Sequence, residues 1–316
     1  MKKSISIIGG DLRIWILAHL LKKDGIDVFT YGFENAKSLD EIYNSDLKNS
    51  ENNIIKCENL KQCIFASDVI VSSIPFTKDE IFVNEEFAKS KIKLEEVLNL
   101  LENKTFVAGK IPNSFYEKSK IKNIKIIDIL KNEEFTILNC ISTSEGAIKI
   151  AIEETKITLN GSNILILGFG RIGKILSKML EGFGANVYCE ARKKEDLAWI
   201  TAFGYKKIDL QNLEENLNKF DLIFNTIPYI ILDEPRLNLI KKDACIIDLA
   251  SKPYGVDKDA IEKFKIDYIL AKALPRKSCT RKCSKNNKTS FRKRKINIKK
   301  QISKIWKVYF LDFITI

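Results

Sequence analysis

Three glycines in the segment GFGRIG, Gly168 to Gly173, could bind the pyrophosphate of a dinucleotide. In such motifs backbone amides approach the phosphates, and the following helix presents its positive N-terminus to them. Gly168 would permit the tight turn, Gly170 would let the backbone approach the pyrophosphate, and Gly173 would let the helix pack closely on the strand. Three side chains between the glycines complete the predicted cofactor loop: Phe169, Arg171 and Ile172.

The elements around these glycines follow the order strand, turn and helix. An apolar run, NILIL at 163–167, enters the motif, and apolar residues at helical spacing follow it from Ile172 to Phe183. A second apolar strand, NVYCEAR at 186–192, lies at the distance expected in a βαβ unit. This context predicts a dinucleotide-binding domain far more specifically than three glycines alone would.

Residues at the end of the second strand bear on the choice between NAD and NADP. An acidic residue there usually binds the ribose hydroxyls of NAD, whereas a basic one accommodates the 2′-phosphate of NADP. Glu190 suits NAD, but Arg192, Lys193 and Lys194 follow it and suit NADP. We therefore favour NADP and keep NAD as the alternative, in which the three cations form an ordinary solvated loop.

Charge and composition argue against several other functions. The net charge is +12, but residues 276–316 hold 14 Lys/Arg against one acid, which leaves 39 Lys/Arg and 40 acids in the rest of the chain. Seven irregularly spaced cysteines form no disulfide or zinc pattern, and His19 is the only histidine. Metal chemistry and histidine-based hydrolysis are therefore disfavoured. Without a signal peptide or membrane-spanning run, we expect a reducing cytoplasm.

A weak internal duplication indicates the fold class. Three pairs of segments resemble one another: 4–10 and 163–170, 68–75 and 221–228, and 105–112 and 245–253. In each half, apolar strands end in polar loops, as parallel strands covered by helices do. We predict an α/β protein with two doubly wound Rossmann-like domains, a cleft between them, and a basic, poorly ordered C-terminal tail.

Four regions follow from this interpretation: a Rossmann-like domain over 1–138, an interdomain helix and linker over 139–160, the dinucleotide-binding domain over 161–275, and the tail over 276–316. The first domain lacks the third glycine, so we expect it on the substrate side rather than at a second nucleotide site. Within it, we expect mostly loop and short helix over 38–61 and a helix within 89–103.

The segment ISTSEGAIKIAIEET, 141–155, has the spacing of a helix start. Ser142 and Glu145 are spaced as a capping box, and apolar residues from Ala147 onward form one face of a helix. The free amides of this N-terminus, with the hydroxyls of Ser142, Thr143 and Ser144, would suit a substrate carboxylate. The alternative is a well-capped connector without a binding role.

Several strings taken together resemble one family. They are NCISTSEGAIKIAIEETKITLNGSNILILGFGRIGK at 139–174, FNTIP at 224–228, IIDLASKPYGVD at 246–257, AKALP at 271–275, and IIGGDLR at 7–13. In combination they resemble the A subunits of the dipicolinate synthases of spore-forming bacteria. The likeness covers the chain from Met1 to about Pro275 and is strongest after Asn139.

This resemblance implies an activity and a partner. It implies NAD(P)-dependent oxidation of a dihydro- or tetrahydrodipicolinate precursor, drawn from the lysine pathway, to dipicolinate, pyridine-2,6-dicarboxylate. It also implies the flavoprotein-like B subunit of dipicolinate synthase as a partner, and action in the mother-cell cytoplasm during sporulation.

The carboxyl ends of the strands are where such chemistry would occur. Asn225, Thr226 and Pro228 would lie beside the nicotinamide, and Asp248 and Lys252 would close the site from the next strand. Because a dianionic substrate needs a cation, Lys252 or Lys110 could pair with one of its carboxylates. Asp248 could act as a catalytic base, although an aspartate at a strand end often only caps the following loop.

Likeness to the family stops after Pro275. The segment 276–316 has cations throughout and an apolar end, where the family has a Pro-Gly loop and an amphipathic helix. One hypothesis is a shifted reading frame in an AT-rich gene. The other takes the tail as genuine and able to bind nucleic acid or an anionic membrane.

Two rival functions stay open on the residues alone. One is another two-domain NAD(P)-dependent amino-acid or hydroxyacid dehydrogenase, and the other is a non-catalytic cofactor-binding protein with a basic tail for an anionic partner. A homo-oligomer is also compatible with the sequence.

Overall fold

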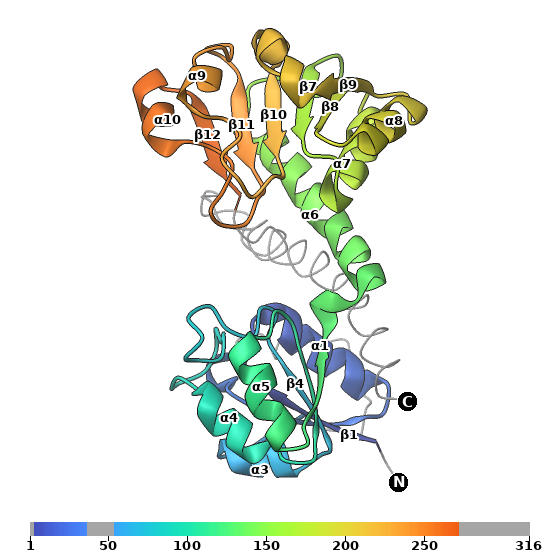
Figure 1. Ribbon diagram of the computed structural model, residues 1–316. Coiled ribbons are helices and arrows are strands. Elements are labelled where there is room, and N and C mark those ends of the chain that lie inside the picture. Colours follow the sequence, from blue (N-terminus) through green and yellow to red (C-terminus); the bar gives the residue numbers. More distant parts are fainter. Residues whose placement is uncertain (1–2, 37–53, 272–316) are drawn as a thin grey trace, which may run out of the picture. The chain divides into compact units, whose positions relative to one another are not determined.

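A computed structural model describes residues 3–36 and 54–271 of the chain. Within them the chain divides into two compact units, the first ending at Thr136 and the second beginning at Ile137 (Figure 1). The sequence places a boundary at 138, close to this division. The expectations for the tail at 276–316 lie outside the described residues.

Unit 1 contains one parallel sheet with the strand order β3-β2-β1-β4-β5-β6. Its strands are β1 (Ser4–Ile8), β2 (Asp27–Tyr31), β3 (Ile54–Lys56), β4 (Val69–Ser72), β5 (Thr105–Ala108) and β6 (Lys125–Asp128). Its helices are α1 (Leu12–Lys23), α3 (Leu60–Phe65), α4 (Leu94–Leu100) and α5 (Asn113–Ile121), with short 3-10 turns η1 (Glu34–Ala36) and η2 (Ile129–Lys131). The helix expected within 89–103 is α4.

Unit 2 repeats the same plan in the order β9-β8-β7-β10-β11-β12, again parallel throughout. Its strands are β7 (Asn163–Leu167), β8 (Asn186–Ala191), β9 (Lys206–Asp209), β10 (Leu222–Asn225), β11 (Cys245–Asp248) and β12 (Asp267–Leu270). Between them lie α7 (Arg171–Gly182), α8 (Lys194–Ala202), α9 (Glu234–Leu237), α10 (Lys258–Phe264) and the 3-10 turns η3 (Leu210–Asn212) and η4 (Glu214–Lys219). The predicted pair of doubly wound α/β domains is confirmed.

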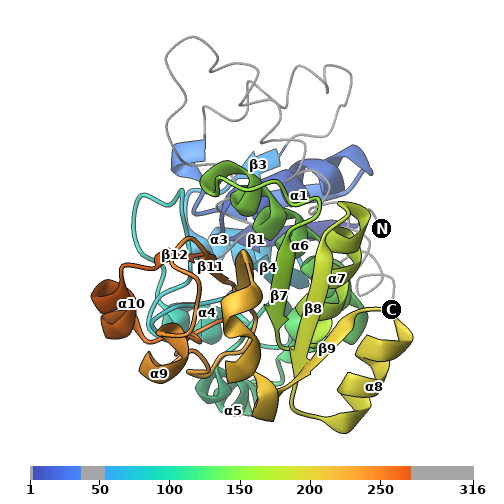
Figure 2. The same cartoon turned by 90° about the horizontal axis from the view of Figure 1, so that it is seen from above.

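Burial on both faces explains the apolar strands of unit 2. On one face, Leu176 of α7 and Leu197 of α8 share a core with Ile164 and Ile166 of β7. On the other face, Leu165 packs with side chains from η4, α9 and α10. Successive residues of β7 therefore enter different cores, as expected of a sheet covered by helices on both sides. Figure 2 shows α7 and α8 alongside β7, β8 and β9.

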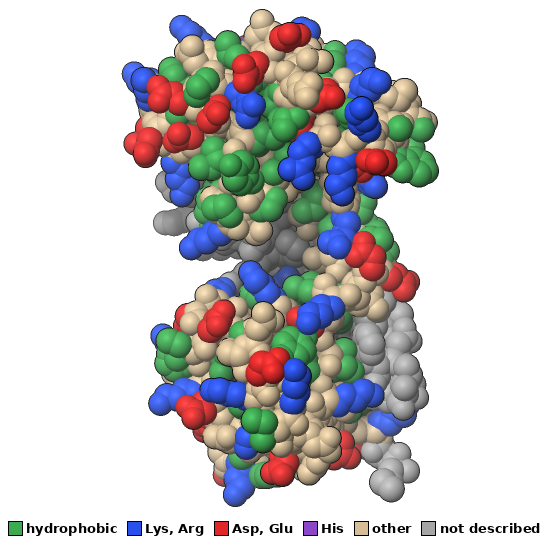
Figure 3. All heavy atoms as spheres, in the orientation of Figure 1, with side chains coloured by type: hydrophobic (Ala, Val, Ile, Leu, Met, Phe, Trp, Pro, Cys, Tyr) green, Lys and Arg blue, Asp and Glu red, His purple; other side chains and the backbone are tan. Residues whose placement is uncertain are grey.

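The surface of the described residues is mixed in charge. On the face drawn in Figure 3, Lys/Arg and Asp/Glu side chains are interspersed over each unit. This distribution agrees with the near balance of 39 basic and 40 acidic residues in the sequence outside residues 276–316. The positive net charge of the chain comes from residues 276–316, so it does not indicate an anionic partner for the two folded units.

One local expectation is wrong, and a second is incomplete. The helix predicted to start at Ser142 is α6, which runs from Glu133 to Glu154. Its first turn is capped by Asn132, whose side-chain oxygen accepts a hydrogen bond from the Phe135 amide at 2.8 Å. The sequence predicts mostly loop and short helix for the segment 38–61, of which 38–53 lie outside the described residues. Its described part has a loop and the start of α3 as expected, but also a strand, β3, which pairs with β2 at the edge of the sheet. β3 is short and largely exposed, so it lacks the apolar pattern that would predict it.

Candidate cofactor-binding site

The glycine motif forms a sharp turn between β7 and α7. Gly168 has φ of +90°, a conformation that favours glycine, and Gly170 is the N-cap of α7 in extended backbone. Because its N-cap residue is a glycine, no side-chain hydrogen bond caps this helix. A Cβ added at Gly170 would meet nothing within 4 Å. The turn therefore combines a positive helix end with open space, which fits a pyrophosphate.

Close packing around the turn fixes its shape. A Cβ at Gly173 would lie 2.1 Å from the carbonyl oxygen of Gly168, so only glycine fits this helix against the turn. The Thr226 hydroxyl donates a hydrogen bond to the Leu167 carbonyl oxygen at 2.8 Å. Phe169 is buried, and its ring packs near Phe203 at a centroid distance of 6.2 Å. Packing of Phe169 and the hydrogen bond of Thr226 thus stabilise the conformation of the glycine turn.

Arg171 and Ile172, the remaining predicted loop residues, begin α7. Arg171 is the first residue of the helix and is exposed, while Ile172 is partly buried. Ile172 lies in the first helical turn, where backbone amides have no partner within the helix. Both positions can therefore contribute backbone donors to the predicted anion site.

A pocket of about 390 Å³ opens beside the turn. Residues from five parts of unit 2 line it: Gly168, Phe169, Glu190, Ala191, Arg192, Lys193, Asp196, Leu210, Ile227, Tyr229, Ile230, Ile231 and Arg236. Apolar side chains of 227–231 form one wall, and charged groups from the end of β8 form another. A pocket with an apolar wall next to a phosphate-binding turn fits the adenosine half of a dinucleotide.

Glu190 lies at the floor of this pocket. Its side chain is 1% exposed, and Oε2 accepts a hydrogen bond from the Gly168 amide at 3.2 Å. Burial raises the pKa of this carboxyl to about 7, and the nearby Asp209 carboxylate acts in the same direction. The Gly168 hydrogen bond, Arg236 and Arg192 lower the pKa, but by less than burial raises it.

A stability change with pH follows from this raised pKa. A carboxyl group with a folded-state pKa of about 7 rather than 4.5 stabilises the fold below pH 4.5, and this contribution is lost as pH rises through about 7. Without cofactor, we expect Glu190→Gln to raise the free energy of unfolding by about 2 kcal/mol at pH 8 and to change it little at pH 5. Denaturant unfolding of both proteins at the two pH values checks this, and an equal difference at both would contradict it.

Basic residues around the pocket come from two elements. Arg192 and Lys193, both predicted cofactor residues, follow β8, are exposed and line the pocket. Arg236, from α9, was not predicted, because a single arginine 44 residues beyond Arg192 carries no motif. Its Nε donates to Glu214 Oε1 at 3.3 Å, and its Nη1 donates to the Ile231 carbonyl oxygen at 3.0 Å. These contacts hold the guanidinium at the pocket wall.

Asn225 and Asp248 form a buried network at the ends of β10 and β11. Both side chains are 0% exposed. Asp248 accepts four hydrogen bonds, from the Asn225 amide at 2.8 Å, the Ala250 and Gly255 backbone amides at 3.0 Å each, and the Tyr268 hydroxyl at 3.3 Å. A buried carboxylate with this many donors has its oxygens fully engaged and shapes the loop after β11. The geometry favours the capping role over that of a base.

The other predicted residues at this edge are accessible. Lys252 and Pro228 are exposed, in the loops that follow β11 and β10. Lys110 belongs to unit 1, where it follows β5; it is exposed with φ of +55°, and its backbone amide donates to Asp128 Oδ1 at 3.0 Å. The two lysines are therefore each available at the carboxyl end of a strand in their own unit.

The predicted carboxylate site at Ser142, Thr143 and Ser144 is wrong in its geometry. These residues lie in the middle of α6, where the backbone amides bond within the helix. The Thr143 hydroxyl donates to the Asn139 carbonyl oxygen at 3.2 Å, and Ser142 and Ser144 are buried. No free helix N-terminus exists there to bind an anion.

Unit 1 has a corresponding turn that differs at the decisive residue. α1 follows β1 as α7 follows β7, but its N-cap is Asp11, whose carboxylate accepts from the Arg13 amide at 2.9 Å and pairs with the Arg13 guanidinium at 2.7 Å. A Cβ at Gly9 would lie 2.9 Å from Val83. A carboxylate thus caps the start of α1, whereas the start of α7 has no side-chain cap.

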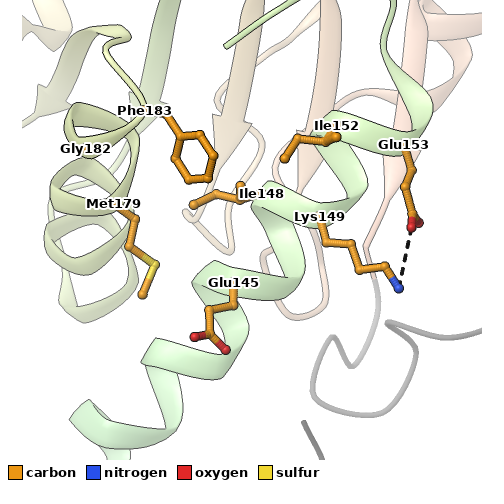
Figure 4. Close-up of a pocket in the computed structure, with 8 residues that line it drawn as sticks. All are labelled: Glu145, Ile148, Lys149, Ile152, Glu153, Met179, Gly182 and Phe183. Carbon is orange, nitrogen blue, oxygen red and sulfur yellow. Dashed lines mark ion pairs between the residues drawn. The ribbon is translucent and has the colours of Figure 1, made fainter. Parts of the chain in front are cut away.

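A second hollow in unit 2, of about 650 Å³, lies between α6 and α7 (Figure 4). It is lined by Glu145, Ile148, Lys149, Ile152, Glu153, Met179, Gly182 and Phe183. Ile152 and Phe183 are 54% and 47% exposed. The wall is mainly apolar and lacks the convergent polar groups of the pocket beside the glycine turn, so we do not place the cofactor there.

Residues 3–36 and 54–271 offer neither a metal site nor a membrane span. In that part of the chain no cluster of three or more His, Cys, Asp or Glu side chains could hold a metal ion. None of the helices there is both long enough and apolar enough to cross a membrane. The glycine turn and its pocket are therefore the candidate functional site of the described residues.

Comparison with known proteins agrees with this geometry. Residues 4–130 match the family model for the N-terminal domain of the dipicolinate synthase A subunit. The A subunit of dipicolinate synthase from Bacillus subtilis (strain 168) is 30% identical over 274 residues, which cover 86% of this chain and 88% of that protein. The chain belongs to the dipicolinate synthase A-subunit family.

Solved structures from this family share the fold of both units. The dipicolinate synthase A subunit from Bacillus halodurans is 24% identical with a TM-score of 0.78, over 99% of this chain and 97% of that one. The corresponding dipicolinate synthase chain from Bacillus subtilis is 26% identical with a TM-score of 0.73, over 97% of each chain. Residues 141–272 match the family model for the D-isomer specific 2-hydroxyacid dehydrogenase NAD binding domain. This member of the dipicolinate synthase A-subunit family thus has a nicotinamide-cofactor domain of oxidoreductase type.

Proposed function

We propose that this protein acts as the A subunit of a dipicolinate synthase, oxidising a reduced dipicolinate precursor with a nicotinamide cofactor. The observation that carries the proposal is the uncapped N-terminus of α7 behind a glycine turn, next to a pocket of adenosine size. Membership of the dipicolinate synthase A-subunit family supports this proposal, in which the substrate is a dihydro- or tetrahydropyridine dicarboxylate. The proposal includes the B subunit of the synthase as a partner and action during sporulation.

Each oxidation of the ring removes two hydrogens. One leaves a ring carbon as a hydride, with two electrons, and reduces the nicotinamide; the other leaves as a proton to water or to a basic group. A dihydro precursor needs one such step to become the aromatic pyridine dicarboxylate, and a tetrahydro precursor needs two. Because aromatisation is favourable, the protein has chiefly to orient the ring and to exclude competing reactions.

The residues of unit 2 divide this work. Thr226 supports the glycine turn, and Asp248 with Asn225 fixes the loop that carries Lys252. We assign Lys252 to a substrate carboxylate, with Lys110 as the second candidate cation, because both are exposed and a dianion needs at least one. Pro228, exposed after β10, is proposed to border the nicotinamide.

We favour NADP over NAD as the cofactor. Arg192, Lys193 and Arg236 line the pocket in which the adenosine ribose would lie, and guanidinium groups bind phosphate through paired hydrogen bonds. NAD would instead use the Glu190 carboxylate for its ribose hydroxyls. The basic lining gives a 2′-phosphate more partners than the single carboxylate gives a hydroxyl.

Cofactor reduction at 340 nm tests the proposal. The full chain, without and with the B subunit of the synthase, is supplied with NADP or NAD and an enzymatically generated dihydrodipicolinate, and product is identified as pyridine-2,6-dicarboxylate. Turnover with this substrate, and none with glycolate, lactate or amino acids, is the expected result. Turnover with a hydroxyacid instead, or cofactor binding without turnover even when the partner is present, would overturn it.

A further inference from the structure

Glu190 occupies a position in which its charge matters to the cofactor. It is 1% exposed, its Oε2 is 3.2 Å from the Gly168 amide nitrogen, and it forms part of the pocket wall. The end of the second strand of such a unit is where the adenosine ribose binds. A group attached to the ribose 2′ position would therefore lie against this carboxyl group.

Charged groups from several elements face Glu190. Arg192 and Lys193 lie just beyond it on the chain, and Asp196 follows in the first turn of α8. Asp209 ends β9, and Arg236 comes from α9 with Glu214 as its ion-pair partner. The carboxylates among these groups offset part of the positive charge of Arg192, Lys193 and Arg236. An ionised Glu190 would therefore repel a second anion bound in the pocket.

This balance differs between the two cofactors, and the inference rests on the function proposed above. A 2′-phosphate carries up to two negative charges, and a buried carboxylate beside it is costly unless one of them is neutralised. Ribose hydroxyls, by contrast, donate hydrogen bonds and favour an ionised carboxylate. A protonated Glu190 can itself donate to a phosphate oxygen.

We propose that binding of a 2′-phosphorylated cofactor places one proton on Glu190, whereas binding of the unphosphorylated cofactor leaves Glu190 ionised. The proton comes from solvent when the free protein is ionised at this residue. Glu190 is therefore the residue through which pH sets the preference between NADP(H) and NAD(H). Burial raises the pKa of the carboxyl to about 7, so Glu190 gains or loses its proton within the pH range of an ordinary cell.

Calorimetric titration of the full chain with NADPH and with NADH tests this directly. Titrations at pH 8 in two buffers with different enthalpies of ionisation give the number of protons taken up on binding. We expect about one proton with NADPH and about none with NADH. Between pH 7 and pH 8.5 the Kd for NADPH should rise about tenfold, and that for NADH should not.

Two variants make the result specific to Glu190. Glu190→Gln should abolish the proton uptake and the rise in Kd, because the amide cannot titrate. Glu195→Gln removes an exposed carboxylate of α8 that does not line the pocket, and it should keep both effects. Uptake of no proton by the native chain, the same uptake by Glu190→Gln, or NADPH binding absent at every pH while NADH binds, would overturn the proposal. Failure of the folded protein to bind either cofactor would instead overturn the proposed function.

Discussion

Replacing Gly170 by aspartate is expected to abolish cofactor binding while leaving the protein at least as stable. Gly170 is the uncapped N-cap of α7, and a Cβ there meets nothing within 4 Å, so the side chain fits. An aspartate would cap the helix as Asp11 caps α1 and would add about 0.5 kcal/mol. Its carboxylate would stand where the pyrophosphate binds, and like charges there should weaken NADPH binding by at least about a hundredfold.

Binding is measured by NADPH fluorescence and stability by denaturant unfolding. Gly182→Asp is the matched control, because it puts the same charge at the opposite end of the same helix. That variant should lose a little stability, since a negative charge is unfavourable at a helix C-terminus, and it should bind NADPH normally. Normal binding by Gly170→Asp would show that the cofactor does not use this helix end.

Removing the charge of Asp248 is expected to destabilise the fold strongly. Asp248→Asn keeps the size of the side chain but presents an amide NH₂ to donors, which include the Ala250 and Gly255 amides. With buried donors left unsatisfied, the free energy of unfolding should fall by about 3 kcal/mol. The loop that carries Lys252 should lose its fixed shape at the same time.

Denaturant unfolding of Asp248→Asn checks this loss. Asp243→Asn, which alters an exposed carboxylate just before the same strand, should change stability by less than about 0.5 kcal/mol. If Asp248→Asn were fully stable but had lost turnover, Asp248 would be the catalytic base and not a structural cap.

Most of the fold could be predicted because short segments of the sequence carry the patterns of its strands and turns. The apolar runs at 163–167 and 245–248 end in polar loops, and each became a buried parallel strand. The glycines at 168, 170 and 173 predicted their turn for the reasons that the structure gives. β3 was not predicted because it has only three residues and is largely exposed, so its sequence has no alternation of apolar and polar residues.

The parts of the site that escaped prediction depend on contacts between distant residues. Arg236 reaches the pocket only because η4 and the 227–231 loop hold its guanidinium. The four donors of Asp248 come from 225, 250, 255 and 268, which no spacing rule connects. The error at Ser142 has a different cause. A Ser-x-x-Glu pattern is common inside helices too, and Asn132 followed by two glutamates was the stronger N-terminal signal.

The strand order of unit 2 also sets when a growing chain can complete the contacts that fix the glycine turn. β7 sits between β8, which follows it closely, and β10, which begins only at Leu222. A nascent chain that has left the ribosome up to residue 220 already contains the glycine turn, but it lacks the Thr226 hydroxyl that supports Leu167 from the other side. The Asp248 network closes later still, with the Gly255 amide. The glycine turn and the loop after β11 therefore reach their final hydrogen bonding only after residues 226 and 255 have been made.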